Sequence, residues 1–150
     1  MDAVDKKIIN RIQDLFPIET RPFRSIAQEL GLGETDVISR IKRLKAKGII
    51  RRIGGNFSPD RLGFFSTLCA ARVSEEKIDL FTRTVNAYSG VTHNYMRDNT
   101  YTYNVWFTFI APEWAIIEEN LKKISLDTGV KDILNLPATH MFKISAKFKV

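Results

Sequence analysis

The first third of the chain carries hydrophobic residues at helical spacing in three short segments. The first predicts a helix over residues 3–16, which Pro17 ends because proline lacks the amide that the next turn needs. A second helix is expected over residues 25–30, and a third follows the turn at residues 31–33 and ends at Gly48. Three helices with a glycine-bearing turn before the last are typical of a helix-turn-helix.

The pattern then changes from helical to extended. Residues 49–57 are expected to form a short strand pair or wing. Beyond it the expected elements are, in order, strand 65–73, helix 75–87, strand 91–97, strand 101–110, helix 112–128 and strands near 132–136 and 141–148. The order β-α-β-β-α-β is typical of a ferredoxin-like sheet with both helices on one face.

The sequence therefore predicts an α+β chain of two domains. Residues 1–60 form a winged-helix-like helix-turn-helix domain with a linking strand, and residues 61–150 form a ferredoxin-like domain for ligand binding, catalysis and dimerisation. The sheet face without helices needs a cover, and in a chain of this size the expected cover is another subunit, with a ligand between the two. We expect Trp106 near that interface.

Composition narrows the class of protein. The 150 residues are 44% hydrophobic and 27% charged, as in ordinary globular chains. The longest apolar stretches, such as residues 105–111, fall far short of the roughly 20 residues that cross a bilayer, and no signal peptide is expected. Cys69 is the single cysteine and cannot form an internal disulfide, so a reducing cytoplasm is expected.

Alternation along the strand at residues 91–97 predicts an unusual face. His93, Tyr95 and Arg97 share one side of the strand with Val91. The next strand is expected to place its mostly polar set of alternate residues on the same side: Thr102, Asn104, Trp106 and Thr108. One interpretation is interface packing, with a hydrogen-bonded His93 and a rim charge at Arg97. The other is a polar and aromatic wall that binds a ligand.

Several stretches carry a more specific pattern. Residues 90–97 read Gly-Val-Thr-His-Asn-Tyr-Met-Arg and residues 103–108 read Tyr-Asn-Val-Trp-Phe-Thr, after Gly-Ile-Ile-Arg-Arg-Ile-Gly at 48–54 and Arg-Leu-Gly at 61–63. With the order of the elements, nearly the whole chain resembles the Lrp/AsnC regulators. The motifs resemble the sirohaem (also written siroheme) decarboxylases of the alternative haem pathway and their nitrite-reductase haem relatives, which are built on the Lrp/AsnC scaffold.

The resemblance implies a carboxy-lyase that converts two acetate side chains of siroheme to methyl groups, giving didecarboxysiroheme. It implies that Tyr95, Tyr103 and Trp106 wall the flat macrocycle, that Arg97 binds a carboxylate, and that Asn104 also contacts the substrate. His93, with Tyr95 as its neighbour, is the expected proton carrier. No cofactor or metal is expected beyond the iron of the substrate, although haem is a possible bound ligand. The partner is a paralogous subunit or a second copy.

Other residues leave alternatives open. His140 follows Pro137 at the start of the expected last strand and is a second candidate for facing the ligand. An axial iron ligand is a competing role for either histidine. Arg51 and Arg52 either reach a carboxylate or phosphate or form a solvated pair.

The competing function is that of a DNA-binding regulator that responds to a small ligand or haem. The net charge of +6 suits nucleic acid or a polycarboxylated ligand without deciding between them. Glu34 and Asp36 lie at the start of the third helix, where a DNA reader meets base edges, and are expected to cap that helix instead. Basic residues further along keep the regulator alternative open: Arg40, Lys42, Arg43, Lys45 and Lys47. The carboxyl-terminal motif favours the enzyme, with weak or absent DNA binding.

Overall fold

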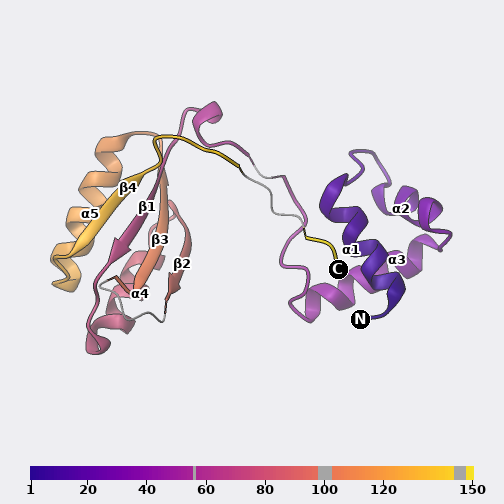
Figure 1. Ribbon diagram of the computed structural model, residues 1–150, viewed down its shortest axis with the longest axis horizontal. Coiled ribbons are helices and arrows are strands. Elements are labelled where there is room, and N and C mark those ends of the chain that lie inside the picture. The colour runs from indigo at the N-terminus through magenta and orange to yellow at the C-terminus, as the bar shows by residue number, and fades with distance from the viewer. Residues whose placement is uncertain (56, 98–102, 144–147) are drawn as a thin grey trace. The chain divides into compact units, whose positions relative to one another are not determined.

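The computed structural model describes residues 1–55, 57–97, 103–143 and 148–150, which belong to two compact units (Figure 1). Unit 1 comprises residues 1–56 and 143–150, and unit 2 comprises residues 57–142. Each unit has its own hydrophobic core. The chain therefore passes from one unit to the other twice.

Unit 1 contains the three expected helices, α1 (Ala3–Asp14), α2 (Pro22–Leu30) and α3 (Glu34–Ala46). Helix α1 ends two residues before the expected position. Pro17 contributes to this early end because a proline disfavours helical backbone at the residue before it. Gly31 closes α2 at a φ of 66°, a left-handed conformation that glycine adopts without steric cost. The helix-turn-helix and its glycine turn are thus confirmed.

The core of unit 1 is built from the hydrophobic faces of its helices. Its fully buried members include Ile8, Ile26, Val37 and Leu44. Ile50 joins them, but none of the described residues of 49–57 forms a strand, so the expected wing is absent from that part of the chain. Its neighbours point to the solvent, and an isolated two-stranded hairpin is at best marginally stable.

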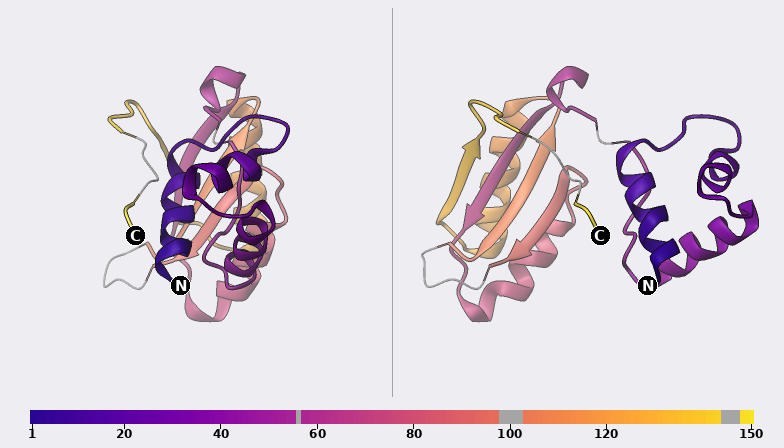
Figure 2. Two further views of the ribbon diagram at one scale, coloured as in Figure 1. Left: turned by 90° about the vertical axis from the view of Figure 1, so that its right-hand side faces the viewer. Right: turned by 45° about the vertical axis from the view of Figure 1, so that its right-hand side comes forward.

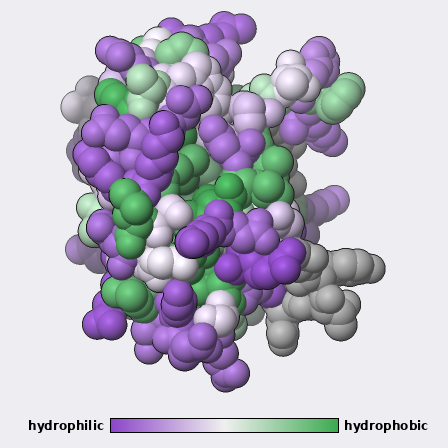
Figure 3. Space-filling model, turned by 90° about the vertical axis from the view of Figure 1, so that its left-hand side faces the viewer, coloured by the Kyte–Doolittle hydropathy of each residue, from purple (hydrophilic) through white to green (hydrophobic). Residues whose placement is uncertain are grey.

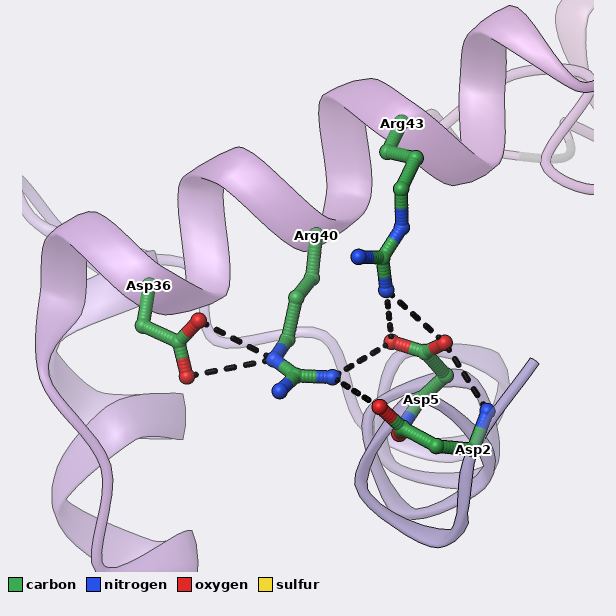
Figure 4. A network of polar contacts seen from close by, with 5 residues as sticks. All are labelled: Asp2, Asp5, Asp36, Arg40 and Arg43. Carbon is green, nitrogen blue, oxygen red and sulfur yellow. Dashed lines mark hydrogen bonds and ion pairs between the residues drawn. The ribbon is translucent and has the colours of Figure 1, made fainter.

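A network of charged side chains joins α1 to α3 (Figure 4). The buried carboxylate of Asp5 accepts hydrogen bonds from Nη1 of Arg40 at 2.9 Å and from Nη2 of Arg43 at 2.8 Å. Arg40 also donates to Asp2 at 2.7 Å and to Asp36 at 3.0 Å. The carboxylates of Asp2 and Asp5 each accept a hydrogen bond from the main-chain N–H of the other residue. This capping box begins α1. The network therefore fixes the first turn of α1 against α3.

Glu34 and Asp36 do not act as the expected caps. The N-cap of α3 is Gly33, and no side chain caps this helix by a hydrogen bond. Glu34 instead pairs with Arg21 and Asp36 pairs with Arg40, one turn along α3. Both carboxylates still lie in the first turn, where the helix dipole favours negative charge. The expectation of capping was wrong because Gly33 takes the N-cap position, which places Glu34 and Asp36 inside the helix.

Unit 2 has the expected ferredoxin-like order, and its α+β class is confirmed. A short 3-10 turn, Asp60–Leu62, precedes the sheet. The elements that follow are β1 (Phe65–Ala71), a 3-10 turn (Glu75–Lys77) leading into α4 (Ile78–Asn86), β2 (Val91–Met96), β3 (Val105–Ala111), α5 (Trp114–Thr128) and β4 (Ile133–Pro137). The strands form one antiparallel sheet in the order β2-β3-β1-β4.

Helices α4 and α5 lie on the same face of this sheet (Figures 1 and 2). Between sheet and helices lies a core whose fully buried side chains include Phe81, Val85, Phe107, Ile117 and Ile124. On the α5 side of the molecule, hydrophilic side chains cover most of the surface, and hydrophobic ones show between them (Figure 3). Among the described residues of unit 2, no helix lies on the opposite sheet face, which is called the open face below.

The carboxyl-terminal part of the chain does not follow the expected pattern. Of the expected strand 141–148, the described residues 141–143 and 148 are not in a strand, and residues 144–147 lie outside the described part. Val150 packs instead against the core of unit 1. The ferredoxin-like order is already complete at β4, so the sheet of unit 2 needs no further strand.

The position of Asp5 predicts a pH-dependent stability of unit 1. Burial raises the pKa of this carboxyl, but the hydrogen bonds from the Asp2 N–H and Arg40, with the charge of Arg43, outweigh burial and hold the pKa below its ordinary value. A carboxylate whose pKa is lowered in the folded state contributes stability above its unfolded pKa of about 4, and that stability is lost as the pH falls. We expect Asp5→Asn to lower the free energy of unfolding at pH 7 by about 1.5 to 3 kcal/mol, the usual contribution of hydrogen bonds to a charged group, and to flatten its decline in acid.

The measurement is urea unfolding between pH 7 and pH 3, followed by far-ultraviolet circular dichroism and by tryptophan fluorescence. Trp106 and Trp114 both lie in unit 2, so a change in helical signal without a change in fluorescence reports unit 1. Asp36→Asn is the matched control, because its exposed pair with Arg40 contributes only about 0.5 kcal/mol. Equal stability of the Asp5→Asn protein and the unaltered chain would contradict the stabilising role given to the Asp5 carboxylate.

Candidate active site

The candidate residues stand on two rungs that cross the open face. On one rung Tyr95 pairs with Trp106, Trp106 with Ala70, and Ala70 with Leu134. On the next, His93 pairs with Thr108, Thr108 with Leu68, and Leu68 with Leu136. Paired residues project to the same side of a sheet, so the expected grouping of His93 and Tyr95 with Trp106 is what the register produces. The polar and aromatic half lies on β2 and β3, and the aliphatic half on β1 and β4.

Val91 does not share this face, contrary to the sequence-based expectation. It pairs with Phe109 and packs against the core, whereas His93 pairs with Thr108. Thr92 is therefore the extra residue of a β-bulge, which reverses the alternation on its two sides. Gly90 precedes the bulge, and a Cβ there would come within 2.3 Å of the Ile110 carbonyl oxygen, so only glycine allows this close approach of the chains.

Arg97 lies over the two aromatic side chains of the rung that contains Tyr95 and Trp106. Its guanidinium carbon is 5.1 Å from the centroid of the Trp106 ring and 5.9 Å from that of Tyr95. The indole N–H of Trp106 donates to the carbonyl oxygen of Tyr103 at 3.1 Å, which orients the ring. A guanidinium in this position adds a cation to an aromatic surface and can pair with a carboxylate in a fork.

His93 is exposed beside this cluster. Its Nδ1 lies 3.1 Å from the hydroxyl oxygen of Thr92, and its ring centroid is 6.4 Å from that of Tyr95. The imidazole and the phenol thus stand next to each other on β2, with the Arg97 guanidinium beyond Tyr95. The structure brings together His93, Tyr95, Arg97 and Trp106 from the predicted set.

Tyr103 and Asn104 are placed differently from these four. The hydroxyl of Tyr103 donates to Asp132 at 2.9 Å, and this hydrogen bond is the main cause that raises the pKa of the phenol. Asn104 uses its carboxamide on the main chain of Val73, accepting from the N–H at 2.9 Å and donating to the carbonyl at 2.8 Å. Both therefore fasten the start of β3 to neighbouring segments, and their role as substrate contacts remains a prediction.

Arg72 and Asp132, which contact Tyr103, are not among the site residues predicted from the sequence. Arg72 forms an ion pair with Asp132 at 3.1 Å, and its guanidinium carbon lies 5.8 Å from the centroid of the Tyr103 ring. Both charges are partly exposed, at the ends of segments that are distant along the chain. Local periodicity carries no signal of such a pair.

The remaining candidates are not members of the two rungs. His140 is exposed beyond the end of β4, with its ring 4.8 Å from that of Phe142. Arg51 and Arg52 are exposed in unit 1 and belong to no strand. The loop expected at Asp98, Asn99 and Thr100 lies outside the described residues, as does Thr102.

A mainly apolar hollow of about 370 Å³ opens where β2 begins. Phe64, Tyr88, Ile110 and Ile116 are among the residues that line it, and its lining does not include the four clustered residues. Within the described part of the chain, His, Cys, Asp and Glu side chains form no group of three that suits a metal ion. No helix there is long and apolar enough to cross a membrane.

Two family models match the chain. Residues 5–51 match the siroheme decarboxylase NirDL-like HTH domain, and residues 61–143 match the AsnC-like ligand binding domain. The siroheme decarboxylase alpha subunit of Oleidesulfovibrio alaskensis is 49% identical over 150 residues, which are 100% of this chain and 90% of that protein. The alpha subunit of Desulfovibrio desulfuricans is 48% identical over the same length and is covered to 85%.

Solved structures agree with this assignment. The crystal structure of the siroheme decarboxylase NirDL in complex with an iron-uroporphyrin III analogue matches 95% of this chain and 46% of that one, with a TM-score of 0.66 and 33% identity. The leucine response regulatory protein LrpA of Mycobacterium tuberculosis, at 15% identity and a TM-score of 0.81 over both full chains, shares the fold. The expected Lrp/AsnC architecture is thus confirmed, and the chain belongs to the siroheme decarboxylase family.

Proposed function

We propose that this chain is a subunit of a siroheme decarboxylase, a carboxy-lyase that converts two acetate side chains of siroheme to methyl groups. The observation that carries the proposal is the 49% identity to an alpha subunit of that name over the whole chain. The clustered residues of the open face support it, because they supply an aromatic surface, a cation and an imidazole together.

The open face suits a flat, carboxylated macrocycle. Trp106 and Tyr95 offer ring faces of the kind on which a tetrapyrrole stacks. Arg97 already lies over both rings, so a stacking ligand has to displace the guanidinium from them. A carboxylate of the ligand compensates for that displacement, because it pairs with the freed guanidinium more strongly than a neutral acceptor does. Arg97 therefore favours ligands that combine a flat ring with a peripheral carboxylate.

The reaction requires one proton for each carbon dioxide lost. The bond between the methylene carbon and the carboxylate carbon breaks, and the electron pair left on the methylene carbon is delocalised into the macrocycle before a proton completes the methyl group. We assign that proton to His93, since imidazole exchanges protons near neutral pH. The neighbouring Tyr95 hydroxyl is the second group on the strand that can relay it.

A partner subunit completes the proposed site. The relatives are named alpha subunits, which indicates a second kind of subunit in those proteins. In this chain the aliphatic half of the open face, with Leu68, Leu134 and Leu136, offers apolar surface for such a cover. A paralogous subunit is the proposed partner, and a second copy of this chain is the alternative.

The charge network of unit 1 argues against the regulator alternative. Arg40 and Arg43 lie on the helix that would read DNA, but their guanidinium groups are bound by Asp2, Asp5 and Asp36. A phosphate contact would have to break these pairs, two of which have the buried Asp5 as their acidic partner. The lysines of α3 remain available for weak electrostatic contacts.

The experiment that tests the function is anaerobic incubation of the chain with siroheme, alone and with a candidate partner subunit. Mass spectrometry is expected to show two successive losses of carbon dioxide. Unchanged siroheme with every partner, although binding is seen by absorbance, would contradict the proposal.

His93→Ala is expected to slow turnover by about two to four orders of magnitude, the usual contribution of a general acid or base, and to leave siroheme binding nearly unchanged. Single-turnover decarboxylation and an absorbance titration separate the two effects. His140→Ala is the matched control and is expected to retain the wild-type rate. If the two variants exchange these results, His140 carries the proton and the assignment to His93 is wrong.

Arg97→Ala is expected to weaken siroheme binding about 10- to 100-fold, the loss of a charged hydrogen bond, and to change the rate of the bound complex less. Arg97→Lys keeps the charge but not the fork and should give an intermediate affinity. Arg83→Ala, an exposed arginine on α4, controls for net charge. Wild-type affinity in Arg97→Ala would exclude the carboxylate contact.

DNA binding is expected to be weak and without sequence preference. Mobility-shift titrations with random and genomic duplexes at physiological salt should give dissociation constants of about 10⁻⁶ M or weaker. A duplex bound with nanomolar affinity and strong preference over random sequence would restore the regulator function.

A further inference from the structure

The chain returns to α1 through a pair of carboxamide side chains. Asn10 donates from Nδ2 to the carbonyl oxygen of Val150 at 3.3 Å, and its Oδ1 accepts from the Val150 N–H at 3.2 Å. Gln13 repeats the arrangement with Phe148, donating to its carbonyl at 3.2 Å and accepting from its N–H at 3.3 Å. Each carboxamide thus satisfies both main-chain polar groups of one residue.

The contact sets two alternate residues of one segment against two carboxamides on one face of α1. In extended chain, residues i and i+2 direct their N–H and C=O groups to the same side, as Phe148 and Val150 do here. On a helix, residues i and i+3 lie on one face, as Asn10 and Gln13 do. The longer side chain of Gln13 extends the reach of the second carboxamide, because three helical residues advance less than two extended ones. The face of α1 therefore offers the donor and acceptor pattern of a strand.

Side chains of the bound segment contribute at one position. Val150 packs against the core of unit 1, whereas Phe148 and Lys149 are exposed. The contact thus consists of main-chain hydrogen bonds at Phe148 and Val150 and of apolar packing by the Val150 side chain. Its partner atoms are 135 and 140 positions apart in the sequence, so the contact closes nearly the whole chain into a loop.

We propose that the helix-turn-helix unit of this chain serves as a receptor for extended main chain, and that Asn10 and Gln13 of α1 hold residues 148–150 as a strap. Asn10, Gln13 and residues 148–150 all belong to unit 1, so the strap closes within that unit. The surface that carries this contact belongs to α1 and not to α3. The inference does not depend on siroheme or on the proposed reaction.

The test is hydrogen exchange of the Phe148 and Val150 amides in the full chain, measured by nuclear magnetic resonance. In Asn10→Ala with Gln13→Ala, we expect both amides to exchange at least about tenfold faster than in the unaltered protein. Alanine is the best helix former, so α1 is expected to persist. Gln28→Ala, an exposed glutamine on α2, is the matched control and should leave both amides unchanged.

A second variant keeps the test independent of the double substitution. Gln13→Glu retains an oxygen that accepts from the Phe148 N–H but removes the donor to the Phe148 carbonyl, so the Phe148 amide should stay protected. Gln13→Ala should release Phe148 more than Val150. Equal exchange rates in the unaltered chain, the single variants and the double variant, with α1 still protected, would overturn the proposal.

Discussion

The pairing of β2 with β3 sets Tyr95 opposite Trp106 and His93 opposite Thr108, and the candidate site depends on that register. A shift of one residue would turn His93 and Tyr95 into the core and bring Asn94 to the open face. Two features hold the register: the bulge at Thr92, and the close approach of Gly90 to the Ile110 carbonyl. The start of β3 is held as well, since Asn104 bonds the Val73 main chain and Tyr103 bonds Asp132.

The same register places different kinds of side chains on the two faces of the sheet. The helix-covered face supplies stability, because its phenylalanine and aliphatic side chains are fully buried between sheet and helices. The open face holds side chains that are exposed or half-buried, including Tyr95, Arg97 and Trp106. Such groups contribute little to folding and are available for a ligand and a partner.

Unit 1 has the fold of a helix-turn-helix, but two of its arginines bind carboxylates within the unit. Its helices keep the order and the glycine turn of a helix-turn-helix. Two arginines of α3, however, are committed to carboxylates, one of them buried on α1. The stability of the unit thus depends on charges that a DNA reader would need for phosphate. The contact of α1 with residues 148–150 gives this unit a structural role within the chain.

Apart from the wing at 49–57 and the strand at 141–148, the sequence by itself determined the element order, and with it the helix-turn-helix, the ferredoxin-like class and the face shared by His93, Tyr95 and Trp106. These follow from periods of 3.6 and 2 along the chain, which encode the faces of local elements. The family also followed from the sequence, because its motifs lie in contiguous stretches such as residues 90–97.

Only the tertiary structure decided how individual side chains are used. Val91 left the predicted face because one extra residue at Thr92 reverses the alternation, and periodicity does not reveal a bulge. Arg40 is bound by Asp5 across 35 positions, and Val150 by Asn10 across 140. Such contacts arise when helices and strands pack, so a pattern read within one segment cannot contain them.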